Sequence, residues 1–368
     1  MNLLIIAGEV SGDLYASYLA KAIKQVSPNH VIYAIGGSKL KSVADFFIFE
    51  SASQHGISFS KQFLNFKLKR SLTDALQHTL DNHNIDRAIL VDFQHFNTLI
   101  STCLQSYSIP IYTFITPNFW MWQSTRLAKK ICQYSEKIIC IFRPEYDFYK
   151  SLHHETYYFG HPLSEIINIP ASPPIFDTTN PIITLLPGSR PQEFSLYLNA
   201  MLQTCDSLLT HYPTLTLLLP VSNKHYKPII QSYLNHYQHL PITLLSESSH
   251  DAIQKSTLVI SGSGSATLEV ILLDRPLIVL AALPAFTYWI AKYILQLKLS
   301  YISLPNFLTN QSIIPEFVQS KIKPKTISNH ALAMLKNPKK FISNYSIVKK
   351  CLIFQKNVYK HIGHKLLN

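Results

Sequence analysis

The chain has 368 residues, enough for two domains of ordinary size. Its 33 basic and 21 acidic residues give a net charge of +12, which favours an anionic partner such as nucleic acid, acidic lipid or a phosphorylated substrate. Only 15% of the residues are charged and 12% are aromatic, a balance that suits a membrane face better than a nucleic-acid groove, so we expect no nucleic-acid partner.

The cysteine pattern and the apolar stretches limit the cellular setting. The five cysteines form no C-x-x-C pair, which predicts reduced thiols in a cytoplasmic protein. The chain opens with a strand, so no signal peptide is expected. Two uncharged stretches, 93–125 and 276–291, are interrupted by polar residues or proline or are too short to span a bilayer, and we predict no transmembrane helix.

The first elements are typical of a Rossmann-like half. An apolar strand at 2–7 is followed by a loop that contains Gly8, Ser11 and Gly12, and then by a helix over 14–25. The loop does not match G-x-G-x-x-G. Its glycines either let the backbone approach a ligand or let the helix pack on the sheet, and both interpretations stay open. A second strand is predicted at 31–35.

An aromatic and basic segment follows at 59–70. Phe63 and Phe66 lie among Lys61, Lys67 and Lys69, a mixture that suits an interfacial segment on anionic lipid. The alternative is a helix that covers the sheet and keeps its lysines in water.

Asp92 lies at the carboxyl end of a predicted strand, 88–92, and open α/β sheets bind ligands at that edge. A carboxylate there is either a helix cap or a catalytic base. Further strands are predicted at 109–115, 138–142 and 157–159, with an aromatic loop at 116–122. His161, alone in a turn, is more often structural than catalytic.

The proline-rich stretch 170–181 is the best linker in the chain. It divides a first Rossmann-like domain, 1–169, from a second, 170–340. A helical, basic segment at 341–368 is expected to pack back toward the first domain.

The second half repeats the alternation of strands and helices. After the strand 182–186, the turn with Ser189 and Arg190 opens a helix, whose N-terminus and nearby arginine suit an anion. An ordinary βα turn with a solvated arginine is the alternative. The other predicted elements are strands at 215–219, 242–245, 257–260 and 275–281, helices at 191–210, 225–236 and 249–255, an aromatic helix from 286, and a loop at 303–308.

A second glycine-rich turn spans 261–269. Its N–H groups can hold a diphosphate or sugar hydroxyls, and Glu269 can accept ribose hydroxyls. Among the 16 histidines and five cysteines there is no metal-binding motif, so no metal and no cofactor are expected.

At this point the chain resembles the lipid-A-disaccharide synthase family, which has the GT-B architecture of two Rossmann-like domains facing across a cleft. Each motif is weak alone, but the ordered set is specific. The matching segments are AGEVSGD at 7–13, IGG at 35–37, VDFQHFN at 91–97, TPNFWMW at 116–122, FGHPL at 159–163, LLPGSRPQE at 185–193, SGSATLE at 263–269, PAFTYWIAK at 284–292 and YISLPN at 301–306.

The resemblance implies an inverting, metal-independent glycosyltransferase of lipid A biosynthesis at the cytoplasmic face of the inner membrane. It would join UDP-2,3-diacylglucosamine to 2,3-diacylglucosamine 1-phosphate, giving lipid A disaccharide 1-phosphate and UDP. The first domain would bind the acceptor and the second the UDP-sugar. Asp92 would be the general base, Arg190 would stabilise departing UDP, and Asn306 would help to bind it. Position matching adds, as substrate-binding residues, Gly8, Ser11, Gly12, Asn97, Ser189, Ser263, Gly264, Thr267 and Glu269.

The chain departs from the family pattern at Gln94, His95, Gln123 and Arg143, which affects acceptor contacts. Two other functions stay open: a UDP-sugar 2-epimerase of the same architecture, and a non-catalytic, membrane-associated sugar-phosphate binding protein. Acyl-chain length, the depth of membrane insertion and a homodimeric state are not fixed by the sequence.

Overall fold

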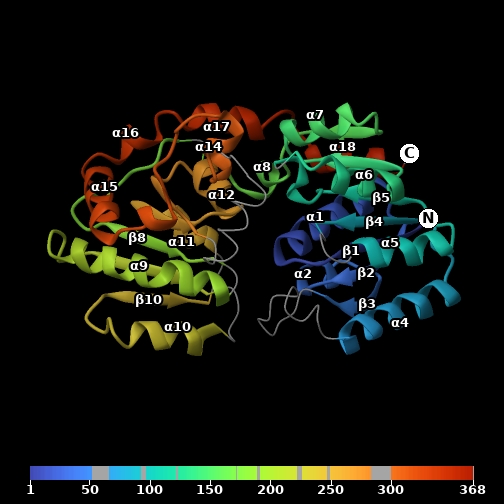
Figure 1. Ribbon diagram of the computed structural model, residues 1–368, viewed down its shortest axis with the longest axis horizontal. Coiled ribbons are helices and arrows are strands. Elements are labelled where there is room, and N and C mark those ends of the chain that lie inside the picture. Colours follow the sequence, from blue (N-terminus) through green and yellow to red (C-terminus); the bar gives the residue numbers. More distant parts are fainter. Residues whose placement is uncertain are drawn as a thin grey trace. The chain divides into compact units, whose positions relative to one another are not determined.

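The computed structural model describes residues 1–51, 66–92, 97–121, 123–170, 172–188, 191–221, 226–246, 249–282 and 300–367, without the side chains of 66–69, 97, 98 and 119 (Figure 1). The chain forms two compact units. Unit 1 contains Met1–Ile166 and Leu352–Asn368, and unit 2 contains Ile167–Cys351. Each unit is a parallel sheet with helices on its faces, which confirms the predicted α/β class.

Unit 1 has seven parallel strands in the order β3-β2-β1-β4-β5-β6-β7. Consecutive strands run outward in one direction from β1 and in the other from β4, so the order reverses between these two neighbours. The strands are β1 Asn2–Ala7, β2 Val31–Gly36, β3 Phe46–Glu50, β4 Arg87–Val91, β5 Ile111–Phe114, β6 Lys137–Cys140 and β7 Thr156–Tyr158.

The helices of unit 1 cover both faces of its sheet. Leu4 and Ile6 of β1 pack in one core cluster with Leu72 and Leu76 of the helix that precedes β4. The first helix packs with the last, where the rings of Tyr18 and Tyr359 stack 5.8 Å apart. The helices are α1 Val10–Val26, α2 Ser38–Lys41, α4 Phe66–Asn82, α5 Asn97–Ser106, η1 Asn118–Trp120, α6 Thr125–Tyr134, α7 Arg143–Ser151, α8 Leu163–Ile166 and α18 Val358–Leu367.

Unit 2 has six parallel strands in the order β10-β9-β8-β11-β12-β13. Here the order reverses between β8 and β11. The strands are β8 Ile182–Leu186, β9 Thr216–Pro220, β10 Ile242–Leu245, β11 Leu258–Gly262, β12 Leu277–Ala281 and β13 Glu316–Val318.

One face of the unit 2 sheet is covered by its longest helices. Ile183 and Leu185 of β8 pack with Leu198 of α9, Ile230 of α10 and Ala331 of α15. The helices are α9 Pro191–Leu209, α10 Lys227–Leu234, α11 Ser249–Lys255, α12 Ala266–Leu272, α14 Leu304–Thr309, η4 Gln319–Lys321, α15 Pro324–Lys336, α16 Pro338–Ile342 and α17 Tyr345–Leu352.

Two local predictions were wrong. Helix α1 begins at Val10 rather than 14, so Ser11 and Gly12 are helical and not part of a loop. The predicted loop at 303–308 is instead helix α14, because Ser303 can precede a helix and Pro305 fits its first turn, where the missing N–H costs nothing.

The C-terminal segment also divides differently from the prediction. Its return to unit 1 begins at Leu352 and not at 341, because α17 packs on unit 2. There the Tyr345 hydroxyl donates to the Arg275 carbonyl at 3.1 Å, and Lys349 pairs with Asp274 at 2.7 Å. Helix α18 does return to unit 1, where the Arg87 side chain donates to the Leu366 carbonyl.

The predicted aromatic segments, 59–70 and the helix from 286, lie almost wholly outside the described residues. Within the ranges that are described, no helix is both long and apolar enough to cross a bilayer.

Candidate active site

Both units place candidate residues at the same kind of position. In an open parallel sheet, the crevice for ligands opens beyond the carboxyl ends of the two strands where the order reverses. In unit 1 these strands are β1, followed by Gly8, and β4, followed by Asp92. In unit 2 they are β8, followed by Pro187 and Gly188, and β11, followed by Ser263.

Asp92, the first residue after β4, has a left-handed backbone conformation with φ at 42°, so the chain turns away from the strand direction there. Asp is among the few side chains that adopt this conformation readily. The Asp92 N–H lies 3.3 Å from the carbonyls of both Phe114 and Ile115, and Ser11 donates to Oδ2 at 3.4 Å. The carboxylate is therefore held at the β1/β4 switch point beside the first turn of α1.

Gly12 makes this approach of helix and strand possible. A Cβ on Gly12 would lie 3.3 Å from the Val91 carbonyl oxygen and 3.5 Å from the Asp92 Cβ. Of the two interpretations left open, the structure favours close packing of the helix on the sheet for Gly12. The neighbouring Asp13 is buried and caps α2, because its Oδ1 accepts from the N–H groups of Gly37 and Leu40 at 2.6 and 3.1 Å.

The buried carboxylate of Glu145 connects the loop after β5 with the loop after β6, at the same edge of the sheet. Glu145 is 1% exposed; its Oε1 accepts from the hydroxyl of Thr116 at 2.6 Å, and its Oε2 accepts from the N–H groups of Ile141 and Phe142 at 2.8 and 3.2 Å. Burial raises the pKa of Glu145 to about 7, and these hydrogen bonds oppose the rise. Glu145 thus fixes the start of the aromatic loop, which sequence analysis had not assigned to any side chain.

His161 has a structural position. Its ring is 1% exposed, packs 4.9 Å from the ring of Phe142, and accepts at Nδ1 from the Leu163 N–H at 3.1 Å. Burial lowers the pKa of His161 to about 3, so the ring is neutral and its proton is on Nε2.

In unit 2 the turn after β8 begins with a glycine that cannot be replaced. Gly188 has φ at 115°, and a Cβ there would come 2.1 Å from the Glu193 carboxylate. Ser189 and Arg190, the next two residues, lie outside the described residues, so their predicted roles stay predictions.

The turn after β11 leaves three backbone donors directed to no acceptor among the described residues. The N–H of Ser263 donates to the Leu280 carbonyl at 2.9 Å, and that of Thr267 to the Gly264 carbonyl at 3.1 Å. The Thr267 hydroxyl also donates to the Gly264 carbonyl, at 2.6 Å. Successive N–H groups of this kind make an anion-binding concavity. The three donors are Gly264, Ser265 and Ala266.

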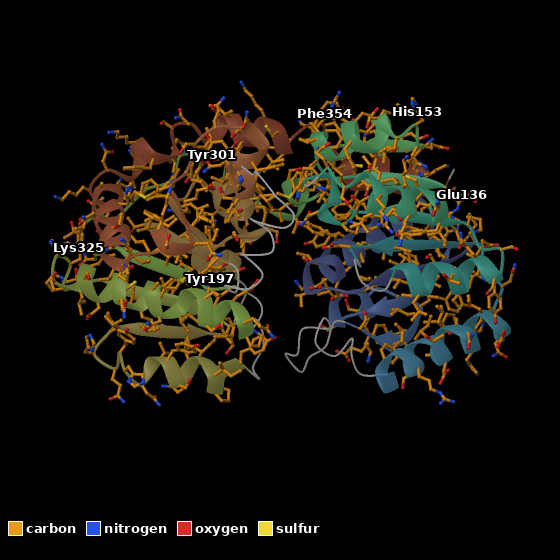
Figure 2. All side chains as sticks on the ribbon, viewed as in Figure 1. Glu136, His153, Tyr197, Tyr301, Lys325 and Phe354 are labelled. Carbon is orange, nitrogen blue, oxygen red and sulfur yellow. The ribbon has the colours of Figure 1, made fainter. Side chains whose placement is uncertain are left out.

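The two glycines of this turn differ in what surrounds them. A Cβ on Gly262 would come 2.9 Å from the Tyr197 ring, so protein packing requires glycine there. A Cβ on exposed Gly264 would meet no atom of the described residues within 4 Å. Tyr197, labelled in Figure 2, extends from α9, and its hydroxyl bonds to both the carbonyl and the N–H of Ala282 at 3.1 Å.

Glu269 lies one turn into α12 and meets a histidine from α11. His250 Nδ1 is 3.1 Å from Glu269 Oε1, and both side chains are largely buried. Sequence analysis had noted Glu269 but not His250, because α11 and α12 come together only in the folded sheet.

Asn306 is fully buried, and its amide is used by the protein itself. Its Oδ1 accepts from the N–H groups of Ile313 and Ile314 at 2.8 and 2.9 Å. Its Nδ2 donates to the Ile314 carbonyl at 2.9 Å and to Glu316 at 3.2 Å. Two acceptances and two donations are all that an amide side chain can make, so Asn306 braces the segment between α14 and β13.

The structure thus groups Gly8, Ser11, Gly12 and Asp92 in unit 1, and Ser263, Gly264, Thr267 and Glu269 in unit 2. The side chain of Asn97 lies outside the described residues, although α5 begins there.

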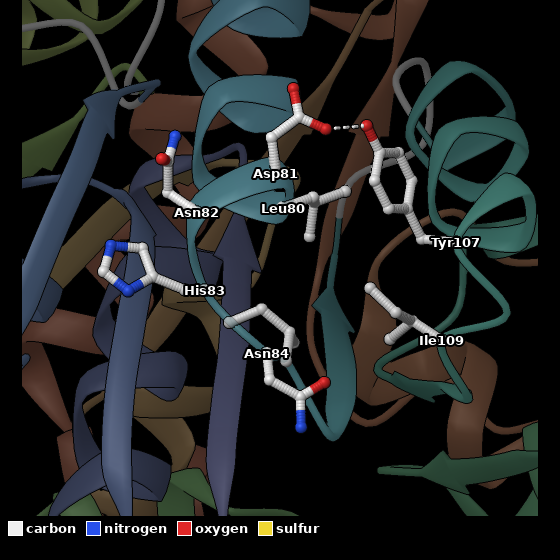
Figure 3. Close-up of a pocket in the computed structure, with 8 residues that line it drawn as sticks. Leu80, Asp81, Asn82, His83, Asn84, Tyr107 and Ile109 are labelled. Carbon is white, nitrogen blue, oxygen red and sulfur yellow. Dashed lines mark hydrogen bonds between the residues drawn. The ribbon is translucent and has the colours of Figure 1, made fainter.

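A separate hollow lies in unit 1 (Figure 3). It has a volume of about 250 Å³ and is lined by Leu80, Asp81 and Tyr107 among others, with the Tyr107 hydroxyl 2.5 Å from Asp81. These residues precede β4 and β5, at the amino edge of the sheet, away from Asp92. Across the described ranges, no group of three or more His, Cys, Asp or Glu side chains could hold a metal ion.

Comparisons with known proteins agree with this geometry. The UDP-GlcNAc 2-epimerase from Neisseria meningitidis, solved bound to UDP-GlcNAc, has a TM-score of 0.63 at 12% identity, covering all of both chains. MurG from Acinetobacter baumannii has a TM-score of 0.56 at 12% identity, covering 100% of this chain and 99% of that one. At such identity both similarities show the fold alone, a pair of Rossmann-like domains of GT-B type.

Sequence relatives go further. The lipid-A-disaccharide synthase from Methylobacillus flagellatus is 29% identical over 343 residues, which cover 90% of this chain and 89% of the relative. A profile of the family described as lipid-A-disaccharide synthetase matches residues 3–362. The chain therefore belongs to the lipid-A-disaccharide synthase family, the glycosyltransferases that make the lipid A disaccharide.

Proposed function

We propose that this chain transfers 2,3-diacylglucosamine from UDP to the 6-hydroxyl of 2,3-diacylglucosamine 1-phosphate, with inversion at the anomeric carbon. The products are lipid A disaccharide 1-phosphate and UDP. Family membership supports the reaction class. The observation that carries the proposal is the pair of switch points with different chemistry, a carboxylate in unit 1 and, in unit 2, a turn whose N–H donors have no acceptor among the described residues.

Asp92 is the general base in this proposal. Direct displacement needs a group that removes the proton of the attacking hydroxyl as the new bond forms, and a carboxylate can do so. Asp92 is partly exposed at the β1/β4 switch point, and the bond from Ser11 sets the direction of its carboxylate. Gly12 leaves room for α1 to pack against the end of β4 at the same edge.

The UDP group binds in unit 2. The diphosphate would accept from the N–H groups of Gly264, Ser265 and Ala266, and Gly264 lets it approach the backbone closely. Arg190 and Ser189, by family resemblance, would contact the same diphosphate and stabilise its charge as UDP departs. Thr267 shapes the turn, since its hydroxyl is already bonded within it.

Asn306 has a positioning role in this proposal. Because its four hydrogen-bonding positions are used internally, it would act by holding the segment that joins α14 to β13, the strand that pairs with β12. This differs from a direct contact with UDP, the role that the resemblance implies.

The lipid substrates imply a peripheral enzyme. Their acyl chains stay in a bilayer, and a net charge of +12 attracts the chain to an anionic leaflet such as the cytoplasmic face of the inner membrane. The aromatic and basic segment 59–70 is the proposed contact.

The test is incubation of the purified chain with UDP-2,3-diacylglucosamine and 2,3-diacylglucosamine 1-phosphate, with products read by mass spectrometry. We expect the disaccharide 1-phosphate and UDP in equal amounts, and only when both substrates are present. Conversion of the UDP-sugar to its 2-epimer without acceptor would support the epimerase instead. Binding of both substrates without any product would indicate the non-catalytic alternative. An Asp92→Asn sample run in parallel controls for contaminating activity.

A further inference from the structure

His250 and Glu269 form a contact that the proposed reaction does not yet explain. His250 is in the first turn of α11 and Glu269 is the fourth residue of α12. Each helix begins after a strand of unit 2, β10 or β11, so both begin at the carboxyl edge of the sheet. The His250 Nδ1 lies 3.1 Å from the Glu269 Oε1. The side chains are 25% and 14% exposed, so both are partly accessible to a ligand while being held by their neighbours.

The chemistry of this contact fixes its direction. A carboxylate accepts, so the imidazole must carry a proton on Nδ1 and donate it. A glutamate side chain otherwise samples many rotamers, and holding it in one conformation removes an ordering cost that a ligand would have to overcome. A carboxylate has about four acceptor positions, so an oxygen that accepts from His250 can also accept from a ligand hydroxyl.

The position of the pair indicates which ligand hydroxyls these are. Glu269 lies about one helical turn beyond the N–H groups of Gly264, Ser265 and Ala266, which have no acceptor in the part of the chain that the structure describes and would hold a diphosphate. In a nucleoside diphosphate the group joined directly to the diphosphate is the ribose, with two neighbouring hydroxyls. A carboxylate at this distance can accept from both.

We propose that His250 is a positioning residue that holds Glu269 in the conformation that accepts the 2′ and 3′ hydroxyls of the ribose, and so sets the preference for a ribonucleotide over a deoxyribonucleotide. This inference rests on the UDP site proposed above, and it adds a residue, His250, and a selectivity that depends on it.

The same unit offers a matched control. His239 Nε2 lies 2.6 Å from Asp206 Oδ1, also a contact between a histidine and a carboxylate, but both side chains are about half exposed. His239 precedes β10 and so lies at the amino edge of the sheet, away from the turn after β11. His239→Ala therefore removes a similar bond at a place where no nucleotide is expected.

The experiment is calorimetric titration of the full chain with UDP, 2′-deoxy-UDP and 3′-deoxy-UDP. For His250→Ala we expect the Kd of UDP to rise roughly three- to tenfold and the Kd of each deoxy analogue to rise by a clearly smaller factor, since each analogue keeps only one of the two hydroxyls that Glu269 would accept. In turnover the KM for the UDP-sugar should rise by a similar factor, with kcat within about twofold. His250→Asn, which keeps a donor near the Nδ1 position, should restore most of the UDP affinity, and His239→Ala should match the wild type.

A double-mutant cycle makes the assignment sharper. In a Glu269→Gln background, His250→Ala should change the UDP affinity little, because the positioned carboxylate is already absent. Equal weakening of UDP and both deoxy analogues by His250→Ala would show a general structural role and overturn the inference, as would unchanged binding of all three. Failure of the wild-type chain to bind UDP at all would instead overturn the proposed function, and the inference with it.

Discussion

The switch points of the two units have the same topology but different residues at the strand ends. At β1/β4 a carboxylate, Asp92, is held by a serine, and the nearby Gly12 is required by packing against Val91. At β8/β11 the turn after β11 carries no carboxylate at its tip, and a Cβ on Gly264 would meet none of the described atoms within 4 Å. The fold therefore determines where a ligand can bind, and in the proposed mechanism the few residues after each strand determine whether that place removes a proton or holds an anion.

The surroundings of the two switch points differ as well. In unit 1 the loops next to Asp92 are held by buried ionisable groups, Glu145 and His161. In unit 2 the corresponding brace is the amide of Asn306 with the Glu316 carboxylate. In unit 1 the two buried groups have shifted pKa values, Glu145 raised and His161 lowered by burial, so the stability of these loops should depend on pH.

The largest expected effect comes from the carboxylate of unit 1. Asp92→Asn removes the proposed base while keeping the shape of the side chain, so kcat should fall by ~10²–10⁴-fold, the usual contribution of a general base. The Kd of UDP, bound in unit 2, should stay within twofold, as measured by calorimetry. Near-normal turnover would remove Asp92 from the mechanism.

The next largest effect is expected on membrane binding. Its measurement tests whether unit 1 alone or both units contact the bilayer. Joint replacement of Phe63, Phe66, Lys67 and Lys69 by serine should weaken binding to anionic vesicles by roughly 10- to 100-fold, since each basic residue contributes ~1 kcal/mol near an anionic surface. Vesicle flotation measures this, with neutral vesicles as the control. A variant that melts far below wild type would show that these side chains are core. If the variant folds and binds vesicles as strongly as the wild type, the membrane contact is not in this segment, and the aromatic segment from 286 becomes the next candidate.

The two glycines of unit 2 separate binding from folding. Gly264→Ala should leave thermal stability unchanged or raise it by ~0.4–1 kcal/mol, because the new methyl group meets no atom of the described residues. It should weaken UDP binding by about tenfold by keeping the diphosphate away from the backbone. Gly262→Ala, the matched control, should lower stability by roughly 1–3 kcal/mol through contact with Tyr197. Unchanged UDP affinity in Gly264→Ala would mean that no ligand approaches this turn.

The smallest effect is on the pH dependence of folding stability, and it tests whether His161 in unit 1 is buried as a neutral ring. Burial lowers the pKa of His161 to about 3, so the unfolded chain binds this proton first as pH falls below about 6.5, and folding stability decreases. His161→Asn keeps an acceptor for the Leu163 N–H, but asparagine does not bind a proton in this pH range. The destabilisation caused by this substitution should therefore be smaller at pH 5 than at pH 7, by about 2 kcal/mol at ~1.4 kcal/mol per pH unit. Urea unfolding at the two pH values measures it, and an equal destabilisation at both would contradict a neutral, buried ring.

Much of this arrangement could be predicted from the sequence. The apolar strands before Gly8, Asp92 and Gly188 have clear patterns, and parallel topology places their carboxyl ends together. The strands β3 and β13 were missed: β3 has only partly buried side chains and β13 only three residues, so neither gives a clear pattern.

The partners of site residues were harder to predict. Glu145, His250 and Glu316 act on residues 10 to 29 positions away in the chain, and no local pattern records such contacts. For Asn306 the sequence motif indicates a contact with a ligand. The structure instead shows that its buried amide makes its hydrogen bonds within the protein.

The central claim is that UDP binds at the β8/β11 switch point and not at β1/β4. Hydrogen exchange of the full chain, read by mass spectrometry with and without saturating UDP, tests it most directly. The account predicts slower exchange in peptides that cover 262–269 and the turn after Gly188, with no change in peptides that cover 8–13 and Asp92. Protection of 8–13 and Asp92 without protection of 262–269 would contradict it.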